Sequence, residues 1–78
     1  MVKVQYFGMV AESAGRPFEY VEVKTSQLSE LIKELYIKYS LNGIALKIAV
    51  NQAVVDLTEN NTVYGEDEIA LLPPFAGG

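Results

Sequence analysis

Residues 28–39 carry a helical pattern that limits the fold of this 78-residue chain more than any other feature. Apolar or aromatic side chains recur there at spacings of three and four, at Leu28, Leu31, Ile32, Leu35 and Tyr39. These positions share one face of an α-helix, and charged residues occupy the other side. Such a helix is stabilised mainly by packing its apolar stripe on another element, which we expect to be a β-sheet. We expect Thr25 and Ser26 to cap its start, and Asn42 or Gly43 to end it in a left-handed turn.

The apolar residues outside this helix follow the two-residue period of β-strands. The expected strands are Val2–Phe7, Phe18–Val23, Lys47–Asn51, Ala53–Asp56 and Ile69–Leu72. In the second strand, Glu19, Glu22 and Lys24 are the expected solvent-facing residues. Residues 9–15 have no clear period and lead into a turn signal that ends at Pro17, so we expect a long hairpin loop there.

The order strand, strand, helix, strand, short strand, strand predicts an α+β fold. The chain is expected to form one domain, residues 1–78, with a mixed sheet of about five strands, the helix on one sheet face and an exposed tail at 73–78. If the first and last strands were central neighbours, the sheet would have the β-grasp arrangement of ubiquitin. The hydrophobic pattern alone does not determine that strand order.

The composition excludes several classes of chemistry. The chain contains no cysteine and no histidine, so Ser-His-Asp and Cys-His catalysis and thiolate metal sites are excluded. Ten acidic against six basic residues give a formal net charge of −4, which argues against nucleic acid or an anionic membrane as partner. No apolar run approaches the roughly 18 residues of a membrane helix, and no signal-peptide pattern is present, so we expect a cytoplasmic protein.

The C-terminal tail consists of Pro73, Pro74, Phe75, Ala76, Gly77 and Gly78. The two prolines cannot continue a helix or a sheet ladder, so they direct the tail away from the folded body. The terminal glycines have no Cβ and fit a channel too narrow for other residues. The reactive group at the tip is the α-carboxylate of Gly78, which is ionised at neutral pH because its pKa is roughly 3.3–3.7. The structural alternative is a frayed terminus, which most chains have.

Other residues are candidates for binding. Phe75 in the tail is a candidate partner contact, because aromatic side chains dominate interface energetics. Phe7 and Leu72 at strand ends are a candidate docking surface, and the structural alternative for Phe7 is a core or sheet-surface position. Residues 66–68 form a carboxylate cluster, which a solvated turn explains more simply than a metal site, because oxygen-ligand cages need more ligands. We therefore expect no metal site.

Five segments together resemble the small sulfur-carrier subunit of molybdopterin synthase, in a ubiquitin-like family shared with the thiamine sulfur carrier. They are residues 4–7, 12–15, 48–52, 65–69 and 72–78. The resemblance covers essentially the whole chain. Its most specific part is the Pro-Pro before the terminal Gly-Gly, which is similar to the molybdopterin branch rather than to the thiamine carriers.

The resemblance implies a β-grasp carrier that is not an enzyme on its own and binds no cofactor. An adenylating enzyme of the ubiquitin-activating kind would use ATP to activate Gly78, and a sulfur-donor protein would convert it into a thiocarboxylate. The large subunit of a heterotetrameric synthase would accept the tail and pass its sulfur to the precursor of the molybdopterin dithiolene. Two alternatives remain open. One is a sulfur carrier for thiamine or another sulfur-requiring pathway, and the other is a ubiquitin-like modifier or interaction domain.

Overall fold

The computed structural model describes residues 1–22, 27–56 and 61–73. The predicted capping residues Thr25 and Ser26 and the tail beyond Pro73 lie outside these ranges.

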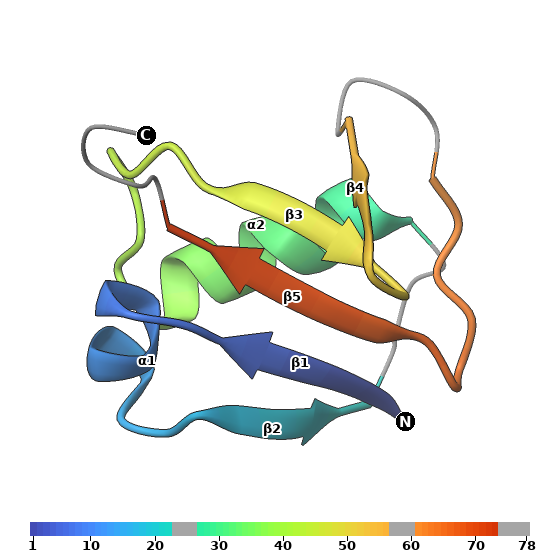
Figure 1. The fold of residues 1–78 in the computed structure, drawn as a ribbon, viewed down its shortest axis with the longest axis horizontal. Coiled ribbons are helices and arrows are strands. Elements are labelled where there is room, and N and C mark those ends of the chain that lie inside the picture. The colour runs from blue at the N-terminus through green and yellow to red at the C-terminus, as the bar shows by residue number, and fades with distance from the viewer. Residues whose placement is uncertain (23–26, 57–60, 74–78) are drawn as a thin grey trace.

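Five strands form one mixed sheet (Figure 1). The elements in chain order are β1 (Val2–Tyr6), α1 (Met9–Ala14), β2 (Phe18–Val21), α2 (Leu28–Lys38), β3 (Lys47–Val50), β4 (Ala53–Val55) and β5 (Glu68–Leu72). The strand order is β2-β1-β5-β3-β4, and β1 and β5 are parallel while the other neighbours are antiparallel. The first and last strands are therefore central neighbours, and the β-grasp arrangement is confirmed.

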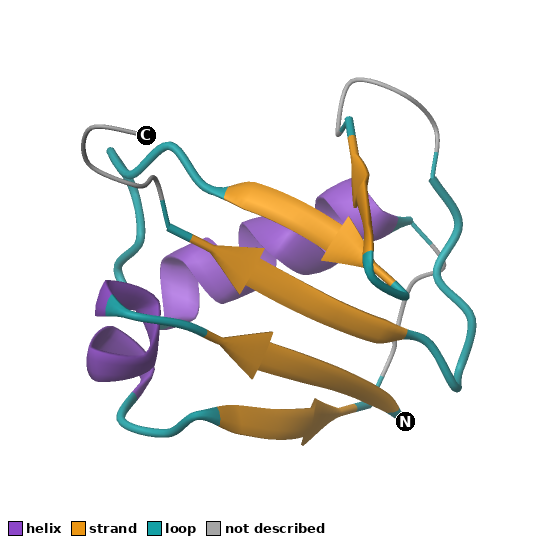
Figure 2. Cartoon of the chain, in the orientation of Figure 1, coloured by secondary structure: helices purple, strands orange, loops and turns teal. Residues whose placement is uncertain are grey.

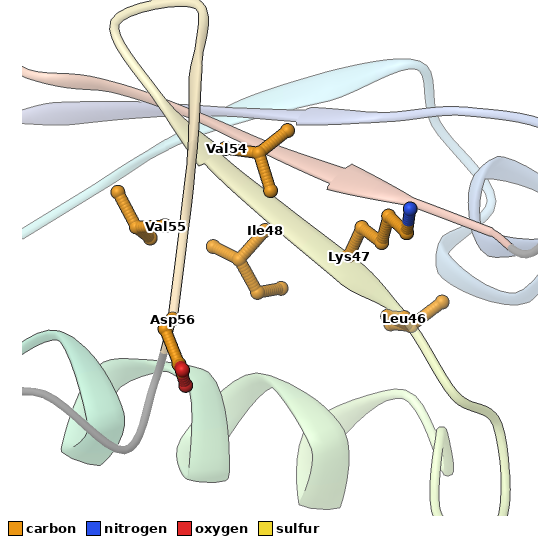
Figure 3. Close-up of a pocket in the computed structure, with 6 residues that line it drawn as sticks. All are labelled: Leu46, Lys47, Ile48, Val54, Val55 and Asp56. Atoms are coloured by element: carbon orange, nitrogen blue, oxygen red, sulfur yellow. The ribbon is translucent and has the colours of Figure 1, made fainter.

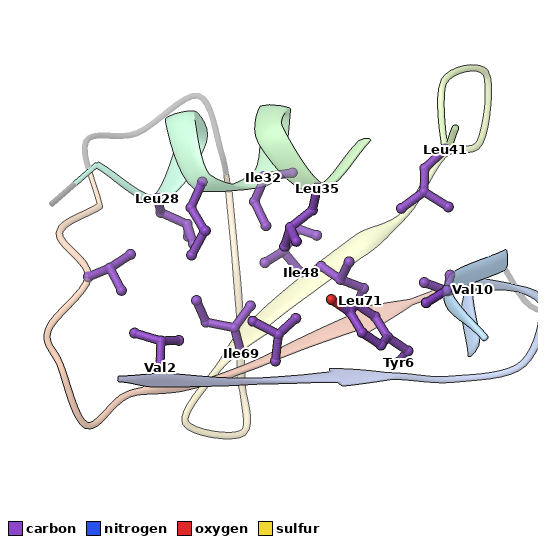
Figure 4. Packing of buried hydrophobic residues seen from close by; sticks show 14 residues of the cluster. Val2, Tyr6, Val10, Leu28, Ile32, Leu35, Leu41, Ile48, Ile69 and Leu71 are labelled. Carbon is purple, nitrogen blue, oxygen red and sulfur yellow. The ribbon is translucent and has the colours of Figure 1, made fainter. Parts of the chain in front are cut away.

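α2 crosses one face of the sheet and encloses the core with it (Figures 2 and 4). The predicted stripe is confirmed at Leu28, Leu31, Ile32 and Leu35, which are all buried, while Tyr39 is half-buried and caps the end of α2. From the sheet, the inward-facing residues of β1, β3 and β5 meet this stripe, namely Val2, Val4, Tyr6, Ile48, Ile69 and Leu71. The core thus extends along β5 as far as Leu71, directly before the tail.

The ends of α2 differ from the expectation. Its N-cap is Gln27, which makes no side-chain capping hydrogen bond. At the other end the left-handed residue is Ser40, with φ of 56°, where Asn42 or Gly43 was expected. The Leu41 N–H donates to the carbonyl of Tyr36 at 2.8 Å, and the Ser40 N–H donates to that of Ile37 at 3.4 Å. This is the Schellman pattern, and it places the buried Leu41 against the core.

The expected loop at residues 9–15 is wrong, because the segment contains the short helix α1. Val10 and Ala14 are its buried residues, one turn apart, and Met9 is exposed. Gly15 ends the helix with φ of 73°, and its N–H donates to the Ala11 carbonyl at 2.9 Å. A helix with only two buried positions has too few turns to produce a visible period.

Candidate functional site

The tail begins at the sheet end where the parallel strands β1 and β5 both finish (Figure 1). Leu72, the last residue of β5, is half-buried and lies opposite the exposed Lys47 of β3. Phe7 follows β1 at the same end and is 42% exposed. Pro73 is half-buried, and its ring Cγ would lie 3.3 Å from a Cβ built on Gly8. The structure therefore brings Phe7, Leu72 and Pro73 to one end of the sheet; Pro74, Phe75, Ala76, Gly77 and Gly78 lie outside the described residues.

The sheet face opposite α2 has no described helix on it (Figure 2). Strand register places Phe18, Gln5, Ala70, Ala49 and Val54 in one row across this outer face. Phe18 and Val54, at the two margins of this row, are exposed. Ala70 and Ala49 have small side chains, so the centre of the row projects little from the sheet. Phe18 makes an edge-to-face contact with Tyr20, and the Lys3 ammonium lies 4.8 Å from the Phe18 ring. The outer face is thus a partly apolar surface, with Lys3 and Gln5 among its apolar residues, and it continues to Leu72 and the start of the tail.

A shallow pocket opens where β4 leaves β3 (Figure 3). β4 pairs only with Ile48 to Val50, so among the described residues no strand covers the far side of Leu46 and Lys47. Because Lys47 pairs with Leu72 in the sheet, this open margin lies one strand away from the tail. Lys47 therefore adds a positive charge at the margin of the outer face, near the point where the tail begins.

Of the three residues predicted to face solvent from the second strand, Glu19 lies on the inner side of β2, Glu22 is exposed just after it, and Lys24 lies outside the described residues. Exposure alternates along β2: Phe18 and Tyr20 are exposed, whereas Glu19 and Val21 are half-buried. The Tyr6 hydroxyl donates to Glu19 Oε2 at 2.5 Å, and the Tyr39 hydroxyl donates to the same oxygen. The expectation that Glu19 faces solvent is therefore wrong, because two hydroxyl donors compensate its burial.

Two cations complete the cluster around this carboxylate. Lys38 Nζ lies 3.4 Å and Arg16 Nη1 3.7 Å from Glu19 Oε1. Burial would raise the pKa of Glu19, but the hydrogen bonds from Tyr39 and Tyr6 and the Lys38 charge outweigh it and lower the pKa below its usual value. Burial and the neighbouring Glu19 raise the pKa of Tyr6, so its hydroxyl stays a donor. The cluster joins β1, β2 and the end of α2, and we assign it a structural role.

The comparisons with known proteins agree with this geometry. The model of the ThiS family matches residues 4–78. The chain belongs to the ThiS family. The molybdopterin synthase sulfur carrier subunit of Drosophila melanogaster is 35% identical over 81 residues, which cover 99% of this chain and 90% of that protein.

Solved structures of similar proteins share the fold. The chain in a protein–protein complex of subunits 1 and 2 of the molybdopterin-converting factor from Helicobacter pylori is 30% identical, with a TM-score of 0.69 and coverage of 99% of this chain and 97% of that one. A putative molybdopterin converting factor subunit 1 from Pyrococcus furiosus has a TM-score of 0.80 at 24% identity, over 95% of this chain and 97% of that one. The resemblance to the ubiquitin-like sulfur carriers is thereby confirmed.

The acidic turn of this ThiS-family chain has a structural account. The Asp67 carboxylate accepts hydrogen bonds from the Tyr64 N–H at 2.8 Å and from Asn51 Nδ2 at 3.1 Å. The Asn51 side-chain oxygen in turn accepts from the Glu68 N–H at 3.0 Å. Within residues 1–22, 27–56 and 61–73, no group of three potential ligand residues could hold a metal ion. The same part of the chain has no helix long and apolar enough to cross a membrane.

The Glu19 cluster predicts a stability change in acid. Because the folded pKa of Glu19 is below its usual value of 4.5, its stabilisation is complete above that pH and is lost as the pH falls through the folded pKa. Glu19→Gln should lower the free energy of unfolding at neutral pH by about 1–3 kcal/mol and flatten its decline in acid. Urea melts across this pH range measure both effects, with the exposed Glu12→Gln as control. A parallel decline in Glu19→Gln and wild type would contradict the prediction.

Proposed function

We propose that this chain is a sulfur carrier of molybdenum cofactor biosynthesis that works through the Gly78 carboxylate. The observation that carries the proposal is the 35% identity, over 99% of the chain, to a protein named as a molybdopterin synthase sulfur carrier subunit. The position of the tail supports it, since β5 ends at Leu72 beside an apolar face that a partner can cover. Six residues, Pro73 to Gly78, then follow β5.

The chemistry proceeds in two stages on the same carbonyl carbon. In the first, the Gly78 carboxylate attacks the α-phosphate of ATP in an activating enzyme and pyrophosphate leaves. A persulfide sulfur of a donor protein then displaces AMP, and a thiol reduces the resulting acyl disulfide, which frees the donor and leaves a thiocarboxylate. In the second, that sulfur displaces an oxygen substituent from a carbon of the pterin precursor inside the large synthase subunit, and water cleaves the acyl–sulfur bond to restore the carboxylate.

This division of work matches the residues of the chain. A free carboxylate is a poor electrophile, and the sequence has no glycine-rich phosphate loop with which to activate itself. It also has no cysteine or histidine to act as nucleophile or general base. Activation and transfer are therefore assigned to the partners, and the chain contributes its terminus and a docking surface.

We assign docking of the large subunit to the outer face of the sheet and to the tail. Aromatic and large apolar residues at the centre of an interface contribute most of its binding energy. Phe7 and Leu72 lie at the end of this face from which the tail starts, with Phe75 three residues beyond Leu72. Binding there would guide the tail into the partner's active site.

Phe75→Ala should weaken binding to the large subunit by about 1 kcal/mol or more, which is at least about fivefold in Kd. Calorimetric titration of the two subunits measures this, beside a thermal melt that should not change. The matched control is Ile37→Ala, which removes an aliphatic side chain that is 75% exposed on α2. Equal affinity of Phe75→Ala and wild type would remove Phe75 from the interface.

The function itself is tested by reconstitution. The purified chain is combined with the activating enzyme, ATP, a sulfur source, the large subunit and the pterin precursor, and dithiolene product is measured. Product that requires both ATP and this chain supports the proposal. A chain that binds the large subunit but yields no product under any sulfur source would contradict it.

A further inference from the structure

β2 forms one edge of the sheet, away from the tail. β2 pairs with β1 on one side only, and among the described residues no strand lies beyond it (Figure 1). An edge strand has unpaired backbone N–H and C=O groups that accept a further strand. Short length, prolines and inward-pointing charges protect such an edge, and β2 has them in part, since it is four residues long, follows Pro17 and turns Glu19 inward; its outer-face side chains, Phe18 and Tyr20, are nevertheless aromatic and uncharged. The β2 edge is therefore open to strand addition.

A groove runs between this edge and α2. Its apolar part is formed by Val21 of β2 and by Leu31 and Leu35 of α2. An extended peptide beside β2 would place alternate side chains into this groove and the others along Tyr20 on the outer face. The groove is thus on the opposite side of the sheet from the apolar face that continues to the tail.

The charged residues that line the groove indicate the charge of its ligand. Lys38 and Glu19 both line it and pair with each other at 3.4 Å. Glu22 and Glu34 also line it, and within the described residues neither has an ion-pair or hydrogen-bond partner. Two uncompensated carboxylates at one groove favour a cationic ligand and oppose a second copy of this acidic chain.

We propose that the β2 edge and the β2–α2 groove bind an extended segment of a protein partner by strand addition. The segment has alternating apolar side chains, and lysine or arginine residues flank it next to Glu22 and Glu34. This interaction does not involve Gly78, so it goes beyond the carrier function and does not depend on it. The chain's own tail does not meet the requirement, because it has two prolines and no basic residue.

The test uses a capped peptide with two lysines followed by alternating valine and isoleucine, titrated into isotope-labelled protein. Backbone resonances of β2 and of the groove face of α2 should shift, and those of β3 and β4 should not. Glu22→Lys combined with Glu34→Lys should weaken binding at least about tenfold, since it replaces two attractions with two repulsions. The matched control is Glu12→Lys combined with Glu66→Lys, which makes the same change in net charge at exposed residues away from the groove.

Two further peptides, N-methylated at alternate residues in the two opposite phases, test the backbone pairing, because the one whose methyl groups face β2 cannot donate hydrogen bonds to it and should not bind. No binding of the unmodified peptide, equal affinity of the two double variants, or binding of both methylated peptides would each overturn the proposal. Sedimentation equilibrium tests for a second copy at this edge. A dimer that the exposed substitution Tyr20→Lys abolishes would assign the edge to self-association and overturn the proposal as well.

Discussion

Deletion of Gly78 is expected to abolish dithiolene formation and to leave the melting temperature of the protein unchanged. The proposed reaction occurs at the terminal carbonyl, and removal of one residue draws that carbonyl back by about 3.3–3.6 Å. Misplacement by about 1 Å can already cost about 100-fold in a positioned reaction. The buried residues of the described chain end at Leu71, so we expect the core to form without Gly78.

Gly77→Val should be nearly as damaging as the deletion. Its branched side chain must pass the same narrow channel, and it forbids the positive-φ conformations that glycine adopts. The control is Ala76→Gly, which keeps the length of the tail and adds no side chain. Reconstituted synthase activity is measured beside a thermal melt of each variant. Activity near wild type after the Gly78 deletion would contradict the carrier function, and a joint loss of activity and melting temperature would assign the tail to the core.

Leu35→Ala should lower the free energy of unfolding by about 2–5 kcal/mol, the range for a large-to-small change at a packed core site. Leu35 is 3% exposed and lies between α2 and the sheet residues Ile48 and Leu71 (Figure 4). In a chain of 78 residues, whose core is small, this loss is a large part of the total stability.

Denaturant melts of Leu35→Ala and of Ile37→Ala compare a buried and an exposed position two residues apart on α2. The Ile37 variant should change the free energy of unfolding by less than about 0.5 kcal/mol. A change of that size in Leu35→Ala would instead place Leu35 outside the packed core.

The helix α2 and the strands were predictable because each has a clear period. Four stripe residues of α2 are buried as predicted, and β1, β3, β4 and β5 differ from their predicted bounds by one residue at one end. Strand order was not predictable from the pattern, since any pairing of half-buried strands satisfies the same alternation. The resemblance to the sulfur carriers supplied the β-grasp order that the topology confirms.

Glu19 of β2 was assigned to the wrong face, whereas Glu22 is exposed as predicted, because both sets of alternating residues in β2 are partly apolar. Phe18 and Tyr20 form one set, and Glu19 and Val21 the other. We expected the charged Glu19 outside, but only tertiary contacts bring the hydroxyls of Tyr6 and Tyr39 to it. Val21 and Val23 share the phase of Glu19 in the sequence, and two β-branched residues in that phase were the available signal for the inner face.

Phe7, Leu72 and Pro73 lie at one end of the sheet, as their positions at the ends of predicted strands indicated, and their role in docking stays a prediction. The prediction for Gly78 concerns chemistry with partners, and it is independent of how this chain packs its own core. The groove at β2 was not predicted, because it is formed by residues that are distant in sequence and have no motif.

The mass of the intact protein, purified from cells that make the molybdenum cofactor, tests the central claim most directly. Replacement of one carboxylate oxygen of Gly78 by sulfur adds about 16 mass units, and oxidation of either of the two methionines adds nearly the same mass, so the position of the added mass decides between them. Fragmentation should place the added mass on Gly78, and the Gly78 deletion should not acquire it. Wild-type protein that remains at its unmodified mass in cells with an active pathway, or that carries Gly78 in isopeptide linkage to lysine instead, would contradict the account.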